Sequence, residues 1–247
     1  MKFTRAITVN SHDLYPNGTL RPSALLREML ETSNLSAEIE HPSMDELLAK
    51  GYYFVVTRTS LSIYADVRKF EPLTVETWAA QIGGAFSYGR CFRLLRGKTP
   101  VAEAASILAL LDLRRGRPVR AGEMEFHYST DKPLELDIPT HLILPPKDCF
   151  TLAGEHIVTL SETDSNRHMN NTRYADMLCD FLPEPETLRV VRMSLSYLCE
   201  AKRGETLKVY RAKGDDGTFF MRTVRTDGKT NIEAEIITDR TEENRNV

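Results

Sequence analysis

The segment between residues 162 and 174 holds the densest set of groups that could do chemistry. Asp164, Asn166 and His168 alternate along it, directly before a predicted helix. Carboxylate and imidazole groups serve in general acid–base catalysis, and an amide can orient a reacting group. The free backbone N–H groups of a helix N-terminus can polarise a carbonyl or stabilise an oxyanion. The alternative interpretation is a polar loop in which an asparagine caps the helix.

Two helices are predicted from apolar spacing and from their ends. One follows Arg21, with Pro22 suited to the first helical position. The other begins after Asn171 and is ended by Pro183 and Pro185. The apolar face of the first is formed by Leu25, Leu26, Met29 and Leu30, and that of the second by Tyr174, Met177, Leu178 and Phe181. Strands are expected at 151–160, 188–200, 205–213, 217–226 and 231–238.

The chain contains an internal repeat. Residues 60–66 resemble 194–200, and residues 97–104 resemble 228–234, at offsets of 134 and 131 in the same order. Each half therefore has one helix and a long antiparallel sheet, which is an α+β arrangement. If the two sheets join edge to edge, two exposed strand edges are covered and the chain is a covalent pseudo-dimer.

A long connection separates the halves. Residues 118–148 contain five prolines and little periodicity, and a connection of this length is typically functional or a linker. We therefore expect an N-terminal domain at 1–117 and a C-terminal domain at 149–247.

Composition excludes several classes of protein. The 247 residues are 41 % hydrophobic and 27 % charged with a net charge of −3, as in a globular protein without a general attraction to nucleic acid or membrane. Residues 1–9 show no signal peptide, so we expect a cytoplasmic protein. The four cysteines have no metal or redox spacing and are expected to be free thiols, buried as small apolar residues.

Three familiar motifs are incomplete. The Gly-Lys-Thr triplets at 97–99 and 228–230 lack the first glycine of a phosphate-binding loop, and a hairpin turn is the better interpretation. Residues 85–89 approach the G-x-S-x-G nucleophile elbow, but a strand rather than a helix is predicted to follow. Neither H-E-x-x-H nor a His/Cys cluster with metal spacing occurs.

The segment from Asp164 to Tyr174 resembles the signature of the acyl-ACP thioesterases, Asp-x-Asn-x-His followed by a hydrophobic residue, two asparagines and a tyrosine. That family also has a catalytic glutamate in a Tyr-x-x-Glu-Cys-x-Arg strand, and residues 197–203 place Glu200 on it. The resemblance implies a tandem hotdog fold, in which each half is one long helix wrapped by an antiparallel sheet. It also implies hydrolysis of the thioester between a fatty acyl chain and the phosphopantetheine arm of acyl carrier protein, with no cofactor of the enzyme's own.

The mechanism implied by this resemblance assigns a role to each group. The thioester carbonyl lies over the N-terminus of the second helix, polarised by backbone N–H groups near Met169 and Asn170. Glu200 and His168 activate or position a water molecule. Asn166 orients the thioester or the water by its amide. Asp164 either fixes this network or attacks directly to give a mixed anhydride.

The sequence departs from the family at one point. Ala201 stands where the family has cysteine, and Cys199 precedes the glutamate instead. Because neighbouring strand residues point to opposite faces, Cys199 and Glu200 cannot both face one site in a regular strand. We therefore expect Cys199 to be structural and Glu200 to be catalytic.

The N-terminal half lacks the signature. Residues 13–17 occupy the corresponding place without an amide–imidazole pair, and Asp66 aligns with Glu200. One active site per chain follows. By the resemblance, the N-terminal half forms the acyl-chain pocket, with Trp78, Phe54 and Met29 as candidates for its lining.

The implied partner is acidic, so a basic docking surface is expected. The candidates are Lys202 and Arg203, beside Glu200, and the cluster of Arg114, Arg115, Arg117 and Arg120. Three other functions remain open: an acyl-CoA thioesterase, a hotdog dehydratase, and a non-catalytic acyl-binding module. Neither nucleic-acid binding nor membrane insertion is expected, and a homodimer remains open.

Overall fold

The computed structural model describes residues 2–136 and 141–240. They form two compact units. Unit 1 comprises residues 1–10 and 26–140, and unit 2 comprises residues 11–25 and 141–247. This division differs from the expected domains, because residues 11–25 belong with the C-terminal unit and most of the segment 118–148 belongs with the first. No helix among the described residues is long and apolar enough to cross a membrane.

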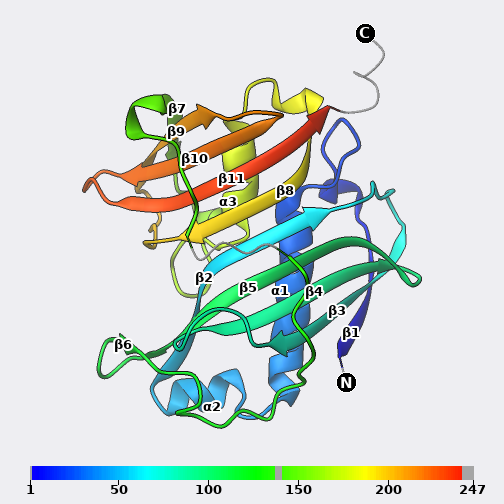
Figure 1. Cartoon of the computed structure of the whole chain (residues 1–247), viewed down its shortest axis with the longest axis vertical. Helices are drawn as coiled ribbons and strands as arrows, with labels where there is room; N and C mark the ends of the chain where they lie inside the picture. The colour runs from blue at the N-terminus through cyan, green and yellow to red at the C-terminus, as the bar shows by residue number, and fades with distance from the viewer. Residues whose placement is uncertain (1, 137–140, 241–247) are drawn as a thin grey trace. The chain divides into compact units, whose positions relative to one another are not determined.

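Unit 1 is an antiparallel sheet with the strand order β1-β3-β4-β5-β2. Helix α1 runs across one face of this sheet (Figure 1). The elements are β1 (Phe3–Thr8), α1 (Pro22–Ile39), α2 (Met44–Ala49), β2 (Tyr52–Ile63), β3 (Pro72–Ala80), β4 (Tyr88–Arg96), β5 (Thr99–Asp112) and the short β6 (Arg117–Pro118). Helix α1 begins at Pro22 as predicted, and Leu25, Leu26 and Met29 are buried.

Unit 2 repeats this order as β7-β9-β10-β11-β8. Its elements are β7 (Thr151–Ile157), α3 (Arg173–Asp180), β8 (Leu188–Tyr197), β9 (Thr206–Lys213), β10 (Thr218–Arg225) and β11 (Thr230–Arg240). All five predicted strands are present, but the strand expected at 188–200 ends at Tyr197. Short 3₁₀ turns lie at Ser11–Asp13, Lys147–Cys149, Leu160–Glu162 and Pro185–Thr187.

The predicted second helix is present but short. It has eight residues, against eighteen in α1, so the C-terminal half does not contain the long helix expected of both halves. Phe181 lies just beyond its end, beside Gly154 of β7. A Cβ at Gly154 would come within 2.6 Å of the Phe181 ring, so only glycine leaves room for this packing.

The hairpin interpretation of the two Gly-Lys-Thr triplets is confirmed. Gly97 and Gly228 stand between β4 and β5 and between β10 and β11, with φ of 61° and 81°. This left-handed backbone favours glycine. The nucleophile elbow is also absent as expected, because Tyr88 begins strand β4 directly after Ser87.

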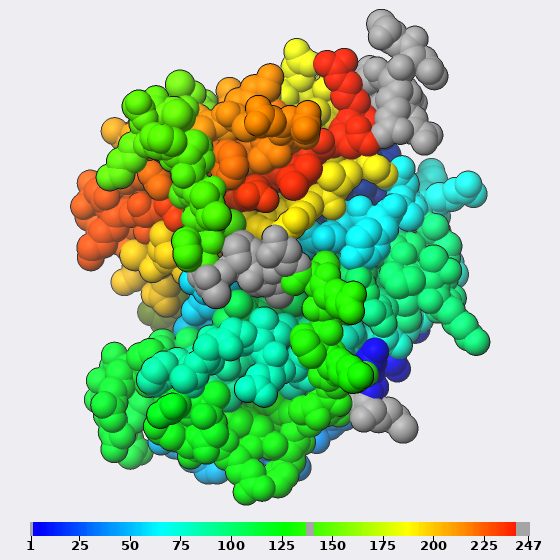
Figure 2. All heavy atoms as spheres, in the orientation of Figure 1, coloured from blue at the N-terminus to red at the C-terminus, as the bar shows by residue number. Residues whose placement is uncertain are grey.

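The segment after β6 belongs to unit 1. The backbone of Thr130 forms a bridge with that of Ala79, and the Trp78 indole N–H donates to the Lys132 carbonyl at 2.9 Å. Figure 2 shows this green segment spread over the surface of the unit. It therefore covers the sheet edge rather than acting as a free linker. Pro139 lies outside the described residues.

The cysteines are free thiols, as expected, but their burial is not uniform. Cys91 and Cys179 are buried, and Cys199 is partly buried. Cys149 is exposed, so the expectation that all four are buried is wrong for this residue. It follows the prolines at 145 and 146 in a 3₁₀ turn, outside both sheets.

Candidate active site

The segment between the Leu160–Glu162 turn and α3 forms a tight loop. The Asp164 N–H donates to the His168 carbonyl at 3.0 Å, and the Arg167 N–H donates to the Asp164 carbonyl at 3.0 Å. The Asp164 carboxylate accepts the Asn166 N–H at 2.8 Å. Arg167 has a φ of 65°, an uncommon left-handed conformation for a residue other than glycine. The loop therefore has Asp164 and His168 at its base and Asn166 at its tip.

Backbone pairing brings Glu200 to this loop. His168 forms a bridge with Lys202, and the Met169 N–H donates to the Ala201 carbonyl at 2.8 Å. As a result, His168 Nε2 lies 3.1 Å from Glu200 Oε2. The histidine side chain is 25 % exposed and the glutamate side chain 65 %. An imidazole in contact with a carboxylate that water can reach is suited to proton transfer.

Glu200 does not lie in a strand. Strand β8 ends at Tyr197, and the N–H groups of Leu198 and Cys199 both donate to the Asn231 carbonyl, at 2.9 and 3.1 Å. The alternation used to separate Cys199 from Glu200 therefore does not apply, and that argument is wrong. The structural role of Cys199 stays a prediction.

The expected oxyanion donors are already engaged. The Met169 N–H donates to Ala201, as above, and the Asn170 N–H donates to the Glu162 carbonyl at 2.8 Å. Both bonds hold the loop, so neither of these two N–H groups is available to a substrate carbonyl in this structure. The next N–H, that of Asn171, has no acceptor within residues 2–136 and 141–240.

Unit 2 contains the same loop twice. The Tyr15 N–H donates to the Thr19 carbonyl at 2.8 Å, the Gly18 N–H to the Tyr15 carbonyl at 2.9 Å, and the Arg21 N–H to the Asp13 carbonyl at 2.9 Å. By this pattern Thr19 corresponds to His168, and Asn17 corresponds to Asn166. The amide is thus present in the first copy, whereas the imidazole is missing and Tyr15 stands in place of the Asp164 carboxylate. The Asn17 Nδ2 donates to the carbonyls of Glu186 and Leu188, which gives it a structural role.

Sequence reasoning missed the side chains that brace the loop. Glu162 accepts hydrogen bonds from the N–H and hydroxyl of Thr159 at 2.7 and 2.8 Å, and its other oxygen lies 2.9 Å from His156 Nε2. Burial opposes ionisation of Glu162, but these hydrogen bonds and His156 hold its pKa below the usual value. The Thr159-x-x-Glu162 spacing of a capping box is the sequence signal for this brace.

The expected basic residues lie in exposed turns. Lys202 and Arg203 follow Glu200 directly, and Arg114 and Arg115 lie in the turn between β5 and β6. The N–H groups of Arg114 and Arg115 both donate to the Asp112 carboxylate, which confirms the predicted hairpin turn. Arg117 begins β6, and Arg120 follows it.

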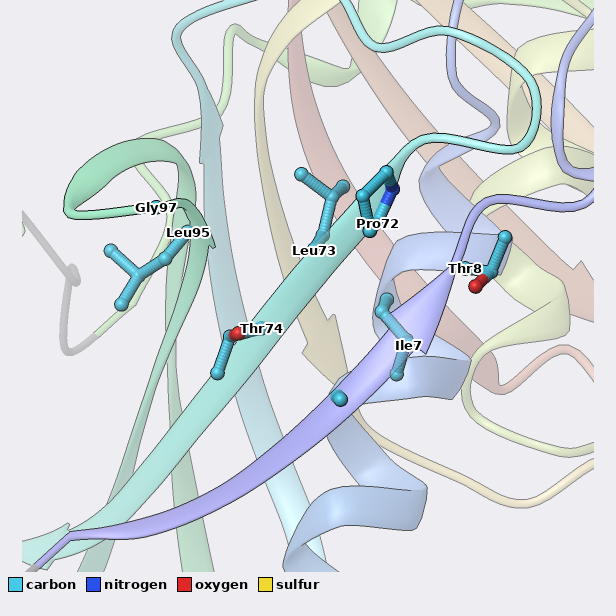
Figure 3. A pocket seen from close by; sticks show the side chains of 8 residues that line it. Ile7, Thr8, Pro72, Leu73, Thr74, Leu95 and Gly97 are labelled. Atoms are coloured by element: carbon cyan, nitrogen blue, oxygen red, sulfur yellow. The ribbon is translucent and has the colours of Figure 1, made fainter.

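The candidate pocket residues in unit 1 form core contacts. Trp78 and Met29 are buried, and Phe54 packs edge-on against Tyr88. A separate surface hollow of about 350 Å³ lies where β1 and β3 run side by side next to the β4–β5 turn (Figure 3). It is lined by residues 6–8, 72–74, 95 and 97, and none of the expected site residues is among them. Within the described part of the chain, no group of three or more His, Cys, Asp or Glu side chains could hold a metal ion.

Comparison with known proteins finds a family model that matches most of the C-terminal unit. Residues 152–242 match the family model of the acyl-ACP thioesterase C-terminal domain, which confirms the resemblance inferred from residues 164–174. No curated protein sequence matches the chain.

Two solved structures share the fold over the whole chain. An acyl-ACP thioesterase from Bacteroides thetaiotaomicron VPI-5482 is 19 % identical with a TM-score of 0.86, and the match covers 96 % of this chain and 97 % of that one. The 12:0-ACP thioesterase from Umbellularia californica is 16 % identical with a TM-score of 0.80, and 97 % of each chain is covered. The tandem hotdog α+β fold predicted from the sequence is therefore confirmed.

Proposed function

We propose that the protein is a thioester hydrolase that cleaves fatty acyl-ACP, releases the free fatty acid and so ends chain elongation. The observation that carries this proposal is the 3.1 Å contact between His168 and Glu200 at the base of the Asp164–His168 loop. This contact lies within the unit that matches the acyl-ACP thioesterase C-terminal domain.

The geometry supports water attack rather than attack by a side chain. Glu200 accepts a proton from water as the water oxygen bonds to the thioester carbon, and this proton passes across the 3.1 Å contact to His168. His168 then donates it to the phosphopantetheine sulfur as the C–S bond breaks. Asp164 already holds the Asn166 N–H, which supports a network role for this carboxylate over formation of an anhydride. Asn166, at the exposed tip, orients the thioester or the water.

The oxyanion role passes to the Asn171 N–H. Its position corresponds to Pro22 in the first copy of the loop, where proline supplies no N–H at all. The copy that has the imidazole thus also has, near the start of α3, a backbone donor without an acceptor in the described part of the chain. A donor of this kind stabilises the charge that develops on the carbonyl oxygen.

Acyl carrier protein is the proposed partner, and the enzyme needs no cofactor because the carrier brings the phosphopantetheine thiol. Lys202 and Arg203 support an acidic partner: both are exposed, they follow Glu200 directly, and neither has an ion-pair partner among the described residues. A positive edge beside the catalytic carboxylate attracts an acidic protein and speeds association.

The test is release of free thiol and fatty acid from acyl-ACPs of C8 to C18, with matched acyl-CoAs alongside. We expect turnover that favours acyl-ACP and is abolished by Glu200→Gln. Equal kcat/KM for the two thioesters would favour an acyl-CoA thioesterase. Absence of hydrolysis by folded protein would refute the proposal and leave the dehydratase or the acyl-binding module.

A further inference from the structure

Asn231 is a buried polar residue in the middle of the sheet of unit 2. It lies near the start of β11 and is 1 % exposed. Its Nδ2 donates to the Tyr174 hydroxyl at 3.1 Å and also to the Cys199 carbonyl, while its Oδ1 accepts the Thr223 hydroxyl at 2.9 Å. Both amide protons and the amide oxygen are therefore used, and the orientation of the side chain is fixed.

These bonds meet at the turn that carries Glu200. Asn231 accepts the N–H groups of Leu198 and Cys199 with its backbone carbonyl and donates to the Cys199 carbonyl with its side chain. The peptide group that precedes Glu200 is thus held by Asn231. At the other end of the network, Tyr174 stands in the first turn of α3, directly after the loop of His168. The buried Asn231 amide therefore links the turn that carries Glu200 to the helix that follows the His168 loop.

The first half of the chain shows the same backbone arrangement without these side chains. The N–H groups of Tyr64 and Ala65 donate to the Val101 carbonyl at 2.9 and 3.3 Å, as Leu198 and Cys199 do to Asn231. Val101 therefore occupies the position of Asn231, and the turn that it holds leads to Asp66 in place of Glu200.

The other two members of the network have apolar counterparts as well. Leu94 pairs with Ala102 in the register in which Thr223 pairs with Ile232. Leu25 stands four residues after Arg21, as Tyr174 stands four residues after Asn170. Leu25, Leu94 and Val101 are all buried. Three core positions are thus apolar in the half without the signature and polar in the half that has it.

The contrast between the apolar and polar core positions indicates that the polar side chains are not needed for the backbone to fold. The first half shows that the backbone turn after the equivalent of β8 forms over an apolar core. Burying polar groups costs free energy unless every hydrogen bond is made, so a complete polar network in place of leucine and valine is not explained by stability. Burial raises the pKa of Tyr174 to about 12.

We propose that Tyr174, Asn231 and Thr223 are positioning residues that set the place of Glu200 relative to His168. This inference rests on the proposed function, since it takes Glu200 as the catalytic carboxylate. Among the described residues, none of the three side chains hydrogen-bonds the side chain of His168 or Glu200. Its loss lets the Cys199–Glu200 peptide shift, and a misplacement of about 1 Å lowers the rate about 100-fold.

A matched pair of variants at Thr223 gives the sharpest test. Thr223→Val keeps the shape and removes the hydroxyl, whereas Thr223→Ser keeps the hydroxyl and removes a methyl group. If the hydroxyl orients Asn231, the serine variant has a higher kcat for acyl-ACP than the valine variant, with KM unchanged in both. If Thr223 only packs in the core, the order is reversed, because the serine variant leaves a cavity.

Two further variants extend the test along the network. Asn231→Leu removes both donors at nearly constant volume, and we expect kcat to fall about 100-fold with little change in KM. The triple variant Tyr174→Leu/Thr223→Leu/Asn231→Val installs the residues of the first half. We expect this variant to fold, with a cooperative thermal unfolding transition, and to be as inactive as Glu200→Gln.

The outcomes distinguish this inference from the proposed function. Hydrolysis that is absent in the wild type, or that survives Glu200→Gln, contradicts the proposed function. An inactive Glu200→Gln together with a wild-type kcat in Asn231→Leu, or with Thr223→Val faster than Thr223→Ser, overturns the positioning network alone. If the triple variant does not fold, the comparison of Thr223→Val with Thr223→Ser still tests the positioning network.

Discussion

Replacing Asn171 by proline tests the oxyanion assignment with little disturbance of the fold. Proline removes the backbone N–H, and the corresponding position in the first copy of the loop is already Pro22. The residue before this position makes the same backbone hydrogen bond in both copies. The Arg21 N–H donates to the Asp13 carbonyl, and the Asn170 N–H donates to the Glu162 carbonyl. The backbone of Asn171 is therefore expected to accept proline, as the corresponding position in the first copy does.

The expected effect on stability is small. The Asn171 N–H has no acceptor among the described residues, so no hydrogen bond is lost. The bond from the Tyr197 hydroxyl to the Asn171 carbonyl, at 3.0 Å, uses an atom that proline keeps. A compatible proline stabilises a protein by about 0.4–1 kcal/mol because it restricts the unfolded chain. Thermal unfolding should therefore show a Tm at or slightly above that of the wild type.

The expected effect on catalysis is large. Loss of one oxyanion donor lowers kcat by about 10²–10³-fold, equivalent to about 2.7–4 kcal/mol of transition-state stabilisation. The assay is steady-state hydrolysis of acyl-ACP, and the matched control is Asn171→Ala, which removes the same side chain and keeps the N–H. The ratio of kcat between the alanine and proline variants isolates the backbone donor. Equal kcat values in two folded variants would refute the assignment.

Three other predictions follow from the site. Glu200→Gln and His168→Ala should each lower kcat by about 10²–10⁴-fold without lowering Tm, and near-normal turnover would remove the residue from the mechanism. The lowered pKa of Glu162 contributes stability that is present above its unfolded pKa of about 4.3 and is lost as pH falls through the folded value. Glu162→Gln should therefore flatten the acid side of a Tm-against-pH curve, and an unchanged curve would contradict the brace. Charge reversal by Lys202→Glu with Arg203→Glu should lower kcat/KM for acyl-ACP at low salt and weaken its salt dependence, whereas an unchanged salt dependence would exclude a docking role.

Local patterns predicted most of the elements. Pro22 and the apolar stripe behind it are sufficient to place the start of α1, and Gly228 with its neighbours is sufficient to place the β10–β11 hairpin. The length of α3 was less accessible, because the helix ends at Asp180 before the prolines are reached and Phe181 turns toward Gly154 of another strand. That contact joins residues 27 positions apart, which no local pattern reports.

The candidate site was predictable in its members but not in its hydrogen bonds. The alternation of Asp164, Asn166 and His168 is visible in the sequence, whereas the pairing of Met169 with Ala201 spans 32 residues and removes the N–H assigned to the oxyanion. The argument that Glu200 lies in a regular strand failed for the same reason. Strand β8 ends at Tyr197, and the N–H groups of the next two residues both donate to the carbonyl of Asn231, which is far away in the sequence. Long-range backbone bonds decide both points.

The internal repeat shows which part of the site is not a consequence of the fold. Both copies of the loop have the same backbone hydrogen bonds, and both have an asparagine at the tip. Within the loop they differ at three site positions, where Asp164, His168 and Asn171 correspond to tyrosine, threonine and proline of the first copy. Outside the loop, the buried Asn231 corresponds to valine. The hotdog backbone alone thus supplies a polar loop and a helix start. The proton-transfer pair, the free backbone donor and the amide that holds Glu200 depend on individual side chains, so each can be removed by substituting the residue that the first half already uses.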